Sequence, residues 1–199
     1  TQTGALDVDG TTSVTDSADD ADITLTKVGN ALTGAITVVS EDTDGDNAED
    51  VDITNSIATV LGGSSQSGTL DVVSKTGNLT QTGGLDVDTT SSFTTEADDA
   101  TITLSNVGNA LTGAVTFTST DTNANDAESV ALTNSIATVL GGSTETGNFI
   151  LASTGAVTQT GAMDIDGTSD INAAANSITL ADVVNDFGGT ISITGGDTI

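Results

Sequence analysis

Acidic side chains are the residues of this chain that could do chemistry. The sequence carries 29 aspartate and glutamate residues against two basic ones, Lys27 and Lys75, and it has no histidine and no cysteine. Without imidazole or thiol groups, the chain lacks the usual general base, the usual covalent nucleophile and the usual zinc ligands. Carboxylates remain as candidate ligands for hard cations and as candidate acid–base pairs.

The densest acidic stretch is EDTDGDNAED, residues 41–50. Asp42, Asp44 and Asp46 alternate as the ligands of calcium loops do, because a hard cation takes several oxygens from one flexible turn. The stretch departs from the EF-hand pattern, since its glycine is Gly45 and its twelfth position is Ile53 instead of glutamate. Two interpretations stay open, a calcium site at these three aspartates and a solvated loop between strands.

A second copy of the stretch, TDTNANDAES, occupies residues 120–129. Its corresponding residues are Asp121, Asn123 and Asn125, which keep the oxygen atoms and lose part of the charge. These three residues form the second candidate metal site. Calcium is the cofactor that the pattern suggests, and no other cofactor is expected.

Paired carboxylates also occur at Asp19–Asp20 and again at Asp98–Asp99. Some β-helical glycosidases use aspartate clusters as acid and base. Their acidic sugar substrates normally require lysine or arginine, however, and neither of the two lysines recurs in the second repeat. We interpret the pairs as polar corners at turns, and we expect a protein that is not an enzyme.

A repeat of about 79 residues carries these side chains. TQTGALDVDG at residue 1 returns as TQTGGLDVDT at residue 80 and as TQTGAMDIDG at residue 158. The predicted units are 1–79, 80–157 and a partial third unit, 158–199, in one continuous solenoid. Repetition within one chain is the signature of stacked architectures.

Each full unit divides into four segments of about 18 to 22 residues, the length of one turn of a parallel β-helix. Apolar and polar residues alternate, so that Ile23 and Leu25 share one face and Thr24 points the other way. The sequence therefore predicts an all-β, right-handed parallel β-helix with about four coils per repeat. The alternative is a string of β-sandwich domains of immunoglobulin or cadherin type, which the absence of tryptophan, tyrosine and proline disfavours.

Three asparagines, Asn30, Asn109 and Asn185, precede the same strand in all three units. Asparagine tolerates a left-handed backbone and bonds to neighbouring backbone groups. We predict that these residues have a structural role at turns.

The segments NALTGAITV, NALTGAVTF and NDFGGTISITGG resemble the repeats of filamentous-haemagglutinin-like β-strand repeat proteins, which are large secreted bacterial surface adhesins and fibres. The resemblance covers essentially the whole chain as a style of repeat. It implies a right-handed parallel β-helix, export to the cell surface, and an adhesive or structural role. No binding residue can be carried over, and this chain departs from the family in its unusual acidity.

Composition limits the partners. A formal net charge of −27 disfavours nucleic acid, since lysine and arginine bind phosphate. No apolar run is long enough to span a bilayer, so we expect no membrane insertion. A coat of cations should surround so negative a chain.

The chain starts and stops inside a repeat, so we expect a piece of a longer polypeptide or a mature form cut from one. Its neighbours would be further solenoid segments or identical copies docked head to tail in a filament. The sequence predicts a non-enzymatic extracellular structural protein, a segment of a surface fibre, stalk or filament. The alternative is an adhesin or binding module that uses the acidic loops in a calcium-dependent way.

Overall fold

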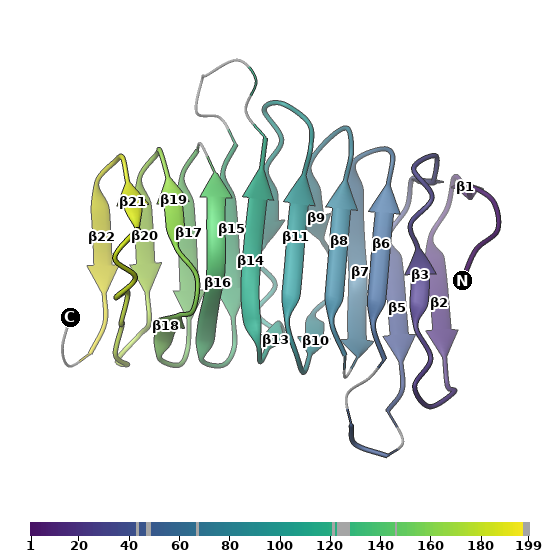
Figure 1. Ribbon diagram of the computed structural model, residues 1–199, viewed down its shortest axis with the longest axis horizontal. Coiled ribbons are helices and arrows are strands. Elements are labelled where there is room, and N and C mark those ends of the chain that lie inside the picture. Colours follow the sequence, from purple (N-terminus) through teal and green to yellow (C-terminus); the bar gives the residue numbers. More distant parts are fainter. Residues whose placement is uncertain are drawn as a thin grey trace.

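The computed structural model describes residues 1–42, 44–46, 49–66, 68–120, 122, 128–145 and 147–196. Across these ranges parallel strands stack along one axis into a β-solenoid, with β1 (Asp7–Val8) and β22 (Ile191–Thr194) at opposite ends (Figure 1). The predicted all-β parallel architecture is confirmed, and tandem sandwich domains do not form. Within the same ranges no helix is long and apolar enough to cross a membrane.

Two broad parallel sheets form the walls of the described solenoid. The eleven-stranded sheet contains β2 (Thr12–Asp16), β5 (Ile36–Ser40), β7 (Thr59–Gln66), β9 (Leu79–Gln81), β10 (Leu85–Val87), β12 (Ile102–Leu104), β13 (Ala110–Leu111), β15 (Val130–Asn134), β17 (Phe149–Ser153), β20 (Ser169–Asn172) and β22 (Ile191–Thr194). The nine-stranded sheet contains β3 (Ile23–Leu25), β6 (Val51–Asn55), β8 (Leu70–Ser74), β11 (Ser91–Thr95), β14 (Ala114–Ser119), β16 (Thr138–Glu145), β18 (Val157–Gln159), β19 (Met163–Ile165) and β21 (Asp186–Phe187). A two-stranded pair, β1 (Asp7–Val8) with β4 (Ala31–Leu32), lies at the N-terminal end.

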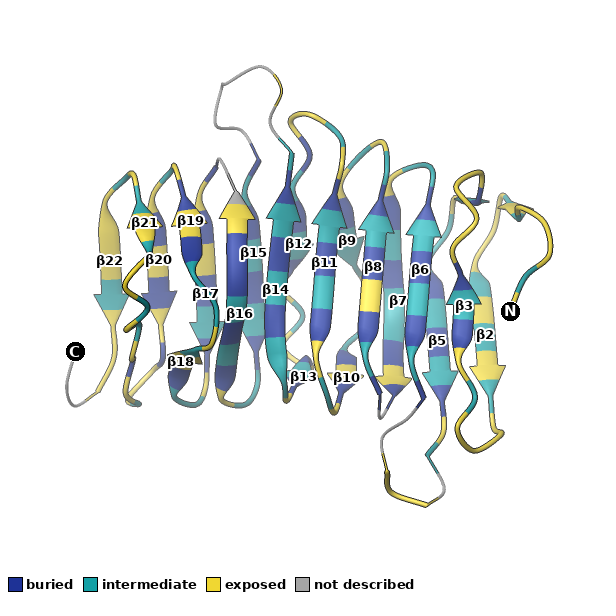
Figure 2. Ribbon diagram, viewed as in Figure 1, coloured by how far each residue is buried: buried dark blue, intermediate teal, exposed yellow. Residues whose placement is uncertain are grey.

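The core lies between the two sheets, and the period-two alternation of the sequence fills it. Ile23 and Leu25 are buried while Thr24 between them is half-buried, as predicted. The same bands of buried and exposed residues run along the other strands (Figure 2). Three phenylalanine rings also fit inside, with ring centroids 6.0 Å apart between Phe93 and Phe117 and 6.1 Å apart between Phe117 and Phe149.

One repeat unit spans three and a half turns, which refines the expectation of about four. Ile23, Val51, Leu70 and Ser91 are successive partners on the nine-stranded sheet, so three turns separate the first from the last. Ile102, the equivalent of Ile23 in the second unit, lies half a turn later on the eleven-stranded sheet. Equivalent strands of successive units therefore alternate between the two sheets, and units one and three share the same phase.

The repeated asparagines fasten consecutive turns together. Asn109 is fully buried, and its side-chain oxygen accepts hydrogen bonds from the Leu85 N–H at 3.0 Å and from the Gln81 amide at 2.8 Å. Its amide group donates to the carbonyl oxygens of Leu104 and Thr133 at 3.0 and 2.9 Å and to the side-chain oxygen of Gln81 at 2.9 Å. The predicted bonding to backbone is thus confirmed for this residue.

The same pairing of asparagine with glutamine occurs in the other two units. Asn30 pairs with Gln2 and Asn185 pairs with Gln159, with side-chain distances of 2.8 and 2.9 Å in both cases. The predicted left-handed backbone is wrong, because the described residues other than glycine with positive φ are Asp20, Asp99 and Ala174. The glutamine of each TQTG phrase is therefore the partner of an asparagine one turn later.

Glycines allow two strands to bulge where the backbones of neighbouring turns approach closely. The register of β5 against β7 shifts between Ile36 and Thr37, and Gly63 at the bulge has a φ of 134°. A Cβ atom added to Gly83 would lie 1.9 Å from the carbonyl oxygen of Gly62. Any larger residue at position 83 would therefore push the two turns apart.

Candidate cation site at the turns

The predicted aspartate triplet lies in the loop that follows β5. The Asp42 side-chain oxygen accepts hydrogen bonds from the N–H groups of Asp44 and Gly45 at 2.9 and 2.5 Å, and Asp44 accepts one from the Asp46 N–H at 3.2 Å. Gly45 has a φ of 87°, which suits glycine. One carboxylate oxygen from each of Asp42, Asp44 and Asp46 lies within 4.8 Å of the other two. The three side chains are thus brought together as predicted, while calcium binding stays a prediction.

A buried glutamate, Glu49, joins this loop to the preceding turn. Strands β2 and β5 are parallel neighbours, so the turns that follow them lie at the same edge of the solenoid. The Glu49 side chain is fully buried, and its Oε1 accepts a hydrogen bond from the Asp20 N–H at 3.2 Å. Carboxylate oxygens of Asp19, Asp42 and Glu49 lie within 4.8 Å of one another, and so do those of Asp20, Asp46 and Glu49.

The second unit repeats the buried part of this arrangement. Glu128 is also fully buried, and its Oε1 accepts a hydrogen bond from the Asp99 N–H at 2.6 Å. Asp98, Asp99 and Glu128 bring carboxylate oxygens within 4.8 Å of one another. The φ angles of Asp20 and Asp99, 57° and 59°, show that the two turns share one conformation. The predicted ligands at 121, 123 and 125 lie outside the described residues.

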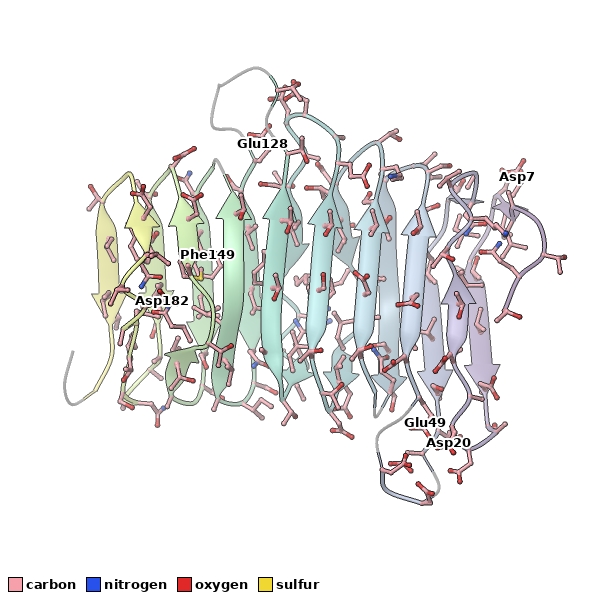
Figure 3. The ribbon with its side chains drawn as sticks, in the orientation of Figure 1. Asp7, Asp20, Glu49, Glu128, Phe149 and Asp182 are labelled. Atoms are coloured by element: carbon pink, nitrogen blue, oxygen red, sulfur yellow. The ribbon has the colours of Figure 1, made fainter. Side chains whose placement is uncertain are left out.

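The two clusters face opposite edges of the solenoid. Figure 3 shows Asp20 with Glu49 at one edge and Glu128 at the other. This follows from the half-integral number of turns per unit, because an equivalent residue of the next unit is rotated by half a turn. The chain therefore presents its acidic turns alternately to its two sides.

The cluster raises the pKa of two of its carboxyl groups. Loss of solvating water raises the pKa of Asp20 above its ordinary value, and the negative charges of Asp44, Asp19 and Glu49 add to this effect. Desolvation likewise raises the pKa of Asp44, followed by repulsion from Asp19 and Asp46. Mutual repulsion of this kind would be relieved by a bound cation.

A third raised pKa lies on the nine-stranded face. Desolvation raises the pKa of Asp52 first, and repulsion from Asp71 comes next, because these two residues are paired on adjacent strands β6 and β8. Like charges at directly neighbouring strand positions oppose each other. The face of the solenoid is thus electrostatically strained at this point.

Our interpretation of the sequence missed Glu49 and Glu128, and it treated the aspartate pairs beside them as polar corners. The alternation of inward and outward residues along the strands could have identified both glutamates. Glu49 shares the parity of the buried residues Val51 and Ile53, and Glu128 precedes Val130 in the same way. Period two therefore directs both carboxylates inward.

The comparisons with known proteins identify one family. The family model described as repeats of unknown function (DUF5649) matches residues 1–39, 48–118 and 127–194. The two internal gaps between the matched segments, residues 40–47 and 119–126, overlap the acidic stretches 41–50 and 120–129. Neither the curated proteins nor the solved structures gave a significant match to the chain.

Proposed function

We propose that this chain, which belongs to the DUF5649 repeat family, is a non-enzymatic structural protein of the cell exterior, a segment of a surface fibre, stalk or filament. The observation that carries the proposal is the continuity of both sheets through all three units. Each turn contributes a layer of core and a ladder of backbone bonds to its neighbour, so the stack resists bending along its whole length. The resemblance to filamentous-haemagglutinin-like repeats supports export to the surface.

The C-terminal end of the described stack presents apolar side chains and open strand edges. At the C-terminal end Ile178, Leu180, Phe187 and Ile193 line a cavity of about 320 Å³. The last strands of the described sheets, β21 and β22, each have a partner on one side only. Further turns of the same polypeptide, or an identical copy docked head to tail, would pair with these strand edges and cover the cavity.

Immunogold labelling of intact source cells with antibodies against residues 1–199 tests the surface role. The proposal predicts label on the outside of unpermeabilised cells, along fibres or a surface layer. Removal of the coding segment should shorten or abolish these structures. Label that appears only after permeabilisation would contradict the proposal.

A second candidate function is a calcium-dependent binding module. Two carboxylate clusters, one around Glu49 and one around Glu128, favour this function. The two glutamates are buried, so their oxygens would be held in place for a hard cation. In this candidate the cation is held by the clustered carboxylates, and the acidic stretches contact an external target. The cation and the target are separable in experiment.

Thermal unfolding followed by circular dichroism tests the cation. Calcium should raise the unfolding temperature by several degrees beyond sodium at equal ionic strength, because a ligand that binds only the folded state stabilises it. The double variant Glu49→Gln and Glu128→Gln should lose this difference, whereas Asp9→Asn, an exposed acid outside the clusters, should keep it. If sodium matched calcium, only a diffuse coat of counterions would remain.

A further inference from the structure

Three turns at equivalent positions of the repeat expose a valine. Val28, Val107 and Val183 are 74%, 80% and 97% exposed. In the part of the chain that the structure describes, six large apolar side chains are exposed, and four of them lie at these turns, Val184 being the fourth. Isolated exposed apolar residues are ordinary, but the same position in every repeat is not.

The turns themselves do not require valine. In the first unit the Asn30 N–H donates to the Lys27 carbonyl at 2.9 Å, which closes a turn with Val28 at its centre. The equivalent bond in the second unit joins Asn109 to Asn106 at 3.2 Å. Glycine, asparagine, aspartate and serine are the residues that such turns favour. The stability of the solenoid therefore does not explain the valine.

The valine also persists where its neighbours have changed. Between the second and third units Asn106 becomes Asp182 and Gly108 becomes Val184, while Val107 remains valine at Val183. The asparagine two residues later remains as well, and its hydrogen bonds explain that. An exposed side chain retained in the most divergent copy indicates contact with something outside the chain.

Each of these turns bulges from a broad face of the solenoid. Strands β12 and β13 on either side of the second turn both belong to the eleven-stranded sheet. In the third unit, the bridge of Ile178 to Val157 in β18 and the strand β21 place the turn in the nine-stranded sheet. Units one and three share a phase, so Val28 and Val183 belong to one face, about 34 Å apart at about 4.8 Å per turn.

The charges beside the two valines of this face are opposite. Lys27 precedes Val28 and Asp182 precedes Val183. Lys27 is one of only two basic residues, and within the described ranges it takes part in no ion pair, whereas Lys75 pairs with Glu96. This face thus has an exposed valine beside a positive charge at one end and an exposed valine beside a negative charge at the other. Such a face is complementary to its own inverted copy.

We propose that the nine-stranded face binds a second copy of this chain in an antiparallel, two-fold arrangement, with the Val28 turn of one copy against the Val183 turn of the other and Lys27 facing Asp182. Two-fold contacts are self-complementary, so both pairs form at once. A parallel arrangement would place lysine against lysine and aspartate against aspartate. A second copy of the chain necessarily carries two valine turns at the same spacing, with the same two charges in the opposite order once it is inverted.

The high negative charge of the chain sets the conditions of this contact. Two chains of −27 repel each other, and between the two turns the face carries the acidic residues Asp52, Asp71 and Asp164. Salt screens this long-range repulsion and leaves the burial of valine intact. Association should therefore strengthen as sodium chloride is raised from low concentration.

Charge exchange gives the sharpest test, with sedimentation followed by interference optics because the chain lacks tryptophan and tyrosine. Lys27→Asp alone and Asp182→Lys alone should each weaken dimerisation several-fold. The combined exchange should restore it to the wild-type value. Equal affinities for all four proteins, or no recovery in the exchange, would overturn the proposal.

Valine substitution tests the apolar part on both faces. Val28→Ser with Val183→Ser should weaken dimerisation by about tenfold for each buried valine, and serine suits a turn, so the variant should fold. Val107→Ser on the opposite face should leave the dimer unchanged. A wild-type chain that stays monomeric at about 1 mM in moderate salt, or an equal loss in Val107→Ser, would refute the arrangement. The purified chain is used throughout, so the outcome does not depend on the proposed surface role.

Discussion

At the scale of single residues, the chain combines buried amides that are fully bonded with carboxylates that repel one another. Asn109 uses both of its side-chain polar atoms in the core, whereas Asp20, Asp44 and Asp52 have raised pKa values. The buried amides hold successive turns together. If the turns separated, these amides would lose their hydrogen-bond partners, and an unpaired buried amide costs free energy. The carboxylates make stability sensitive to protons and cations.

Replacement of Asn109 by alanine should destabilise the solenoid by about 2–4 kcal/mol, because the backbone groups of Leu85, Leu104 and Thr133 lose their partner inside the protein. Thermal and urea unfolding followed by circular dichroism measure the loss. The matched control is Asn172→Ala, an exposed asparagine whose side-chain oxygen accepts a hydrogen bond from the nearby Ala174 N–H. Equal effects of the two substitutions would contradict the role assigned to Asn109.

Lowering the pH should stabilise the protein when divalent cations are absent. Because the pKa values of Asp20, Asp44 and Asp52 are raised in the folded chain above 3.8, the folded state binds protons at a pH where the unfolded state does not. Stability then rises as the pH falls from neutral through the raised values, and it levels off near 3.8. Unfolding temperatures measured at constant ionic strength check this, and a steady decline over that range would be incompatible with it.

At the scale of strands and turns, the backbones of neighbouring turns approach so closely at some positions that only glycine fits there. The bulge of β7 at Gly63 brings its backbone against the turn at Gly83, and the bulge of β16 at Gly142 is its counterpart in the second unit. Each long strand of this type is paired along its length with two short strands of the next turn. The turn between those short strands, at Gly83 in one case and at Gly161 in the other, lies close against the backbone of the long strand.

Gly83→Ala should destabilise the chain by about 2 kcal/mol or more, because the new Cβ would collide with the Gly62 carbonyl oxygen and two backbones would have to separate. Gly10→Ala is the control, since a Cβ there meets nothing within 4 Å. Urea unfolding of both variants measures the difference. Comparable stability of the two would show that the bulge relaxes without cost.

The strands, their inward faces and the stacking of the turns could be predicted from the sequence. Alternation of Ile23, Thr24 and Leu25 gave the strand and its inward face, and the repeated TQTG phrase gave the stacking. The rotation by half a turn between successive units could not be predicted, because the turns differ in length. In register, 28 residues separate Ile23 from Val51, but 19 separate Val51 from Leu70. An average segment length cannot reveal on which sheet the next unit begins.

The candidate site was predictable only in part for a related reason. Asp42, Asp44 and Asp46 are close in sequence, so a local pattern found them. Glu49 meets Asp20 only because β2 and β5 are parallel neighbours, a contact between residues 29 positions apart. Local motifs do not report contacts that the stacking of turns creates.

At the scale of the whole molecule, the described residues form one continuous rod whose repeat advances by three and a half turns. Successive units lie about 17 Å apart along the axis and are rotated by half a turn, and every second unit returns to the same orientation after about 34 Å, at about 4.8 Å per turn. Acidic turns and valine turns then follow the same alternation. Features of one kind are thereby distributed over both sides of the rod.

Electron microscopy of longer arrays of this repeat, with averaging along the axis, distinguishes a continuous solenoid from a string of separate domains. A continuous solenoid should appear as a rod of constant width with a turn spacing of about 4.8 Å, a step of about 17 Å per repeat unit and a full period of about 34 Å. Globular beads about 40 Å apart, joined by thin linkers as separate sandwich domains would be, would contradict it.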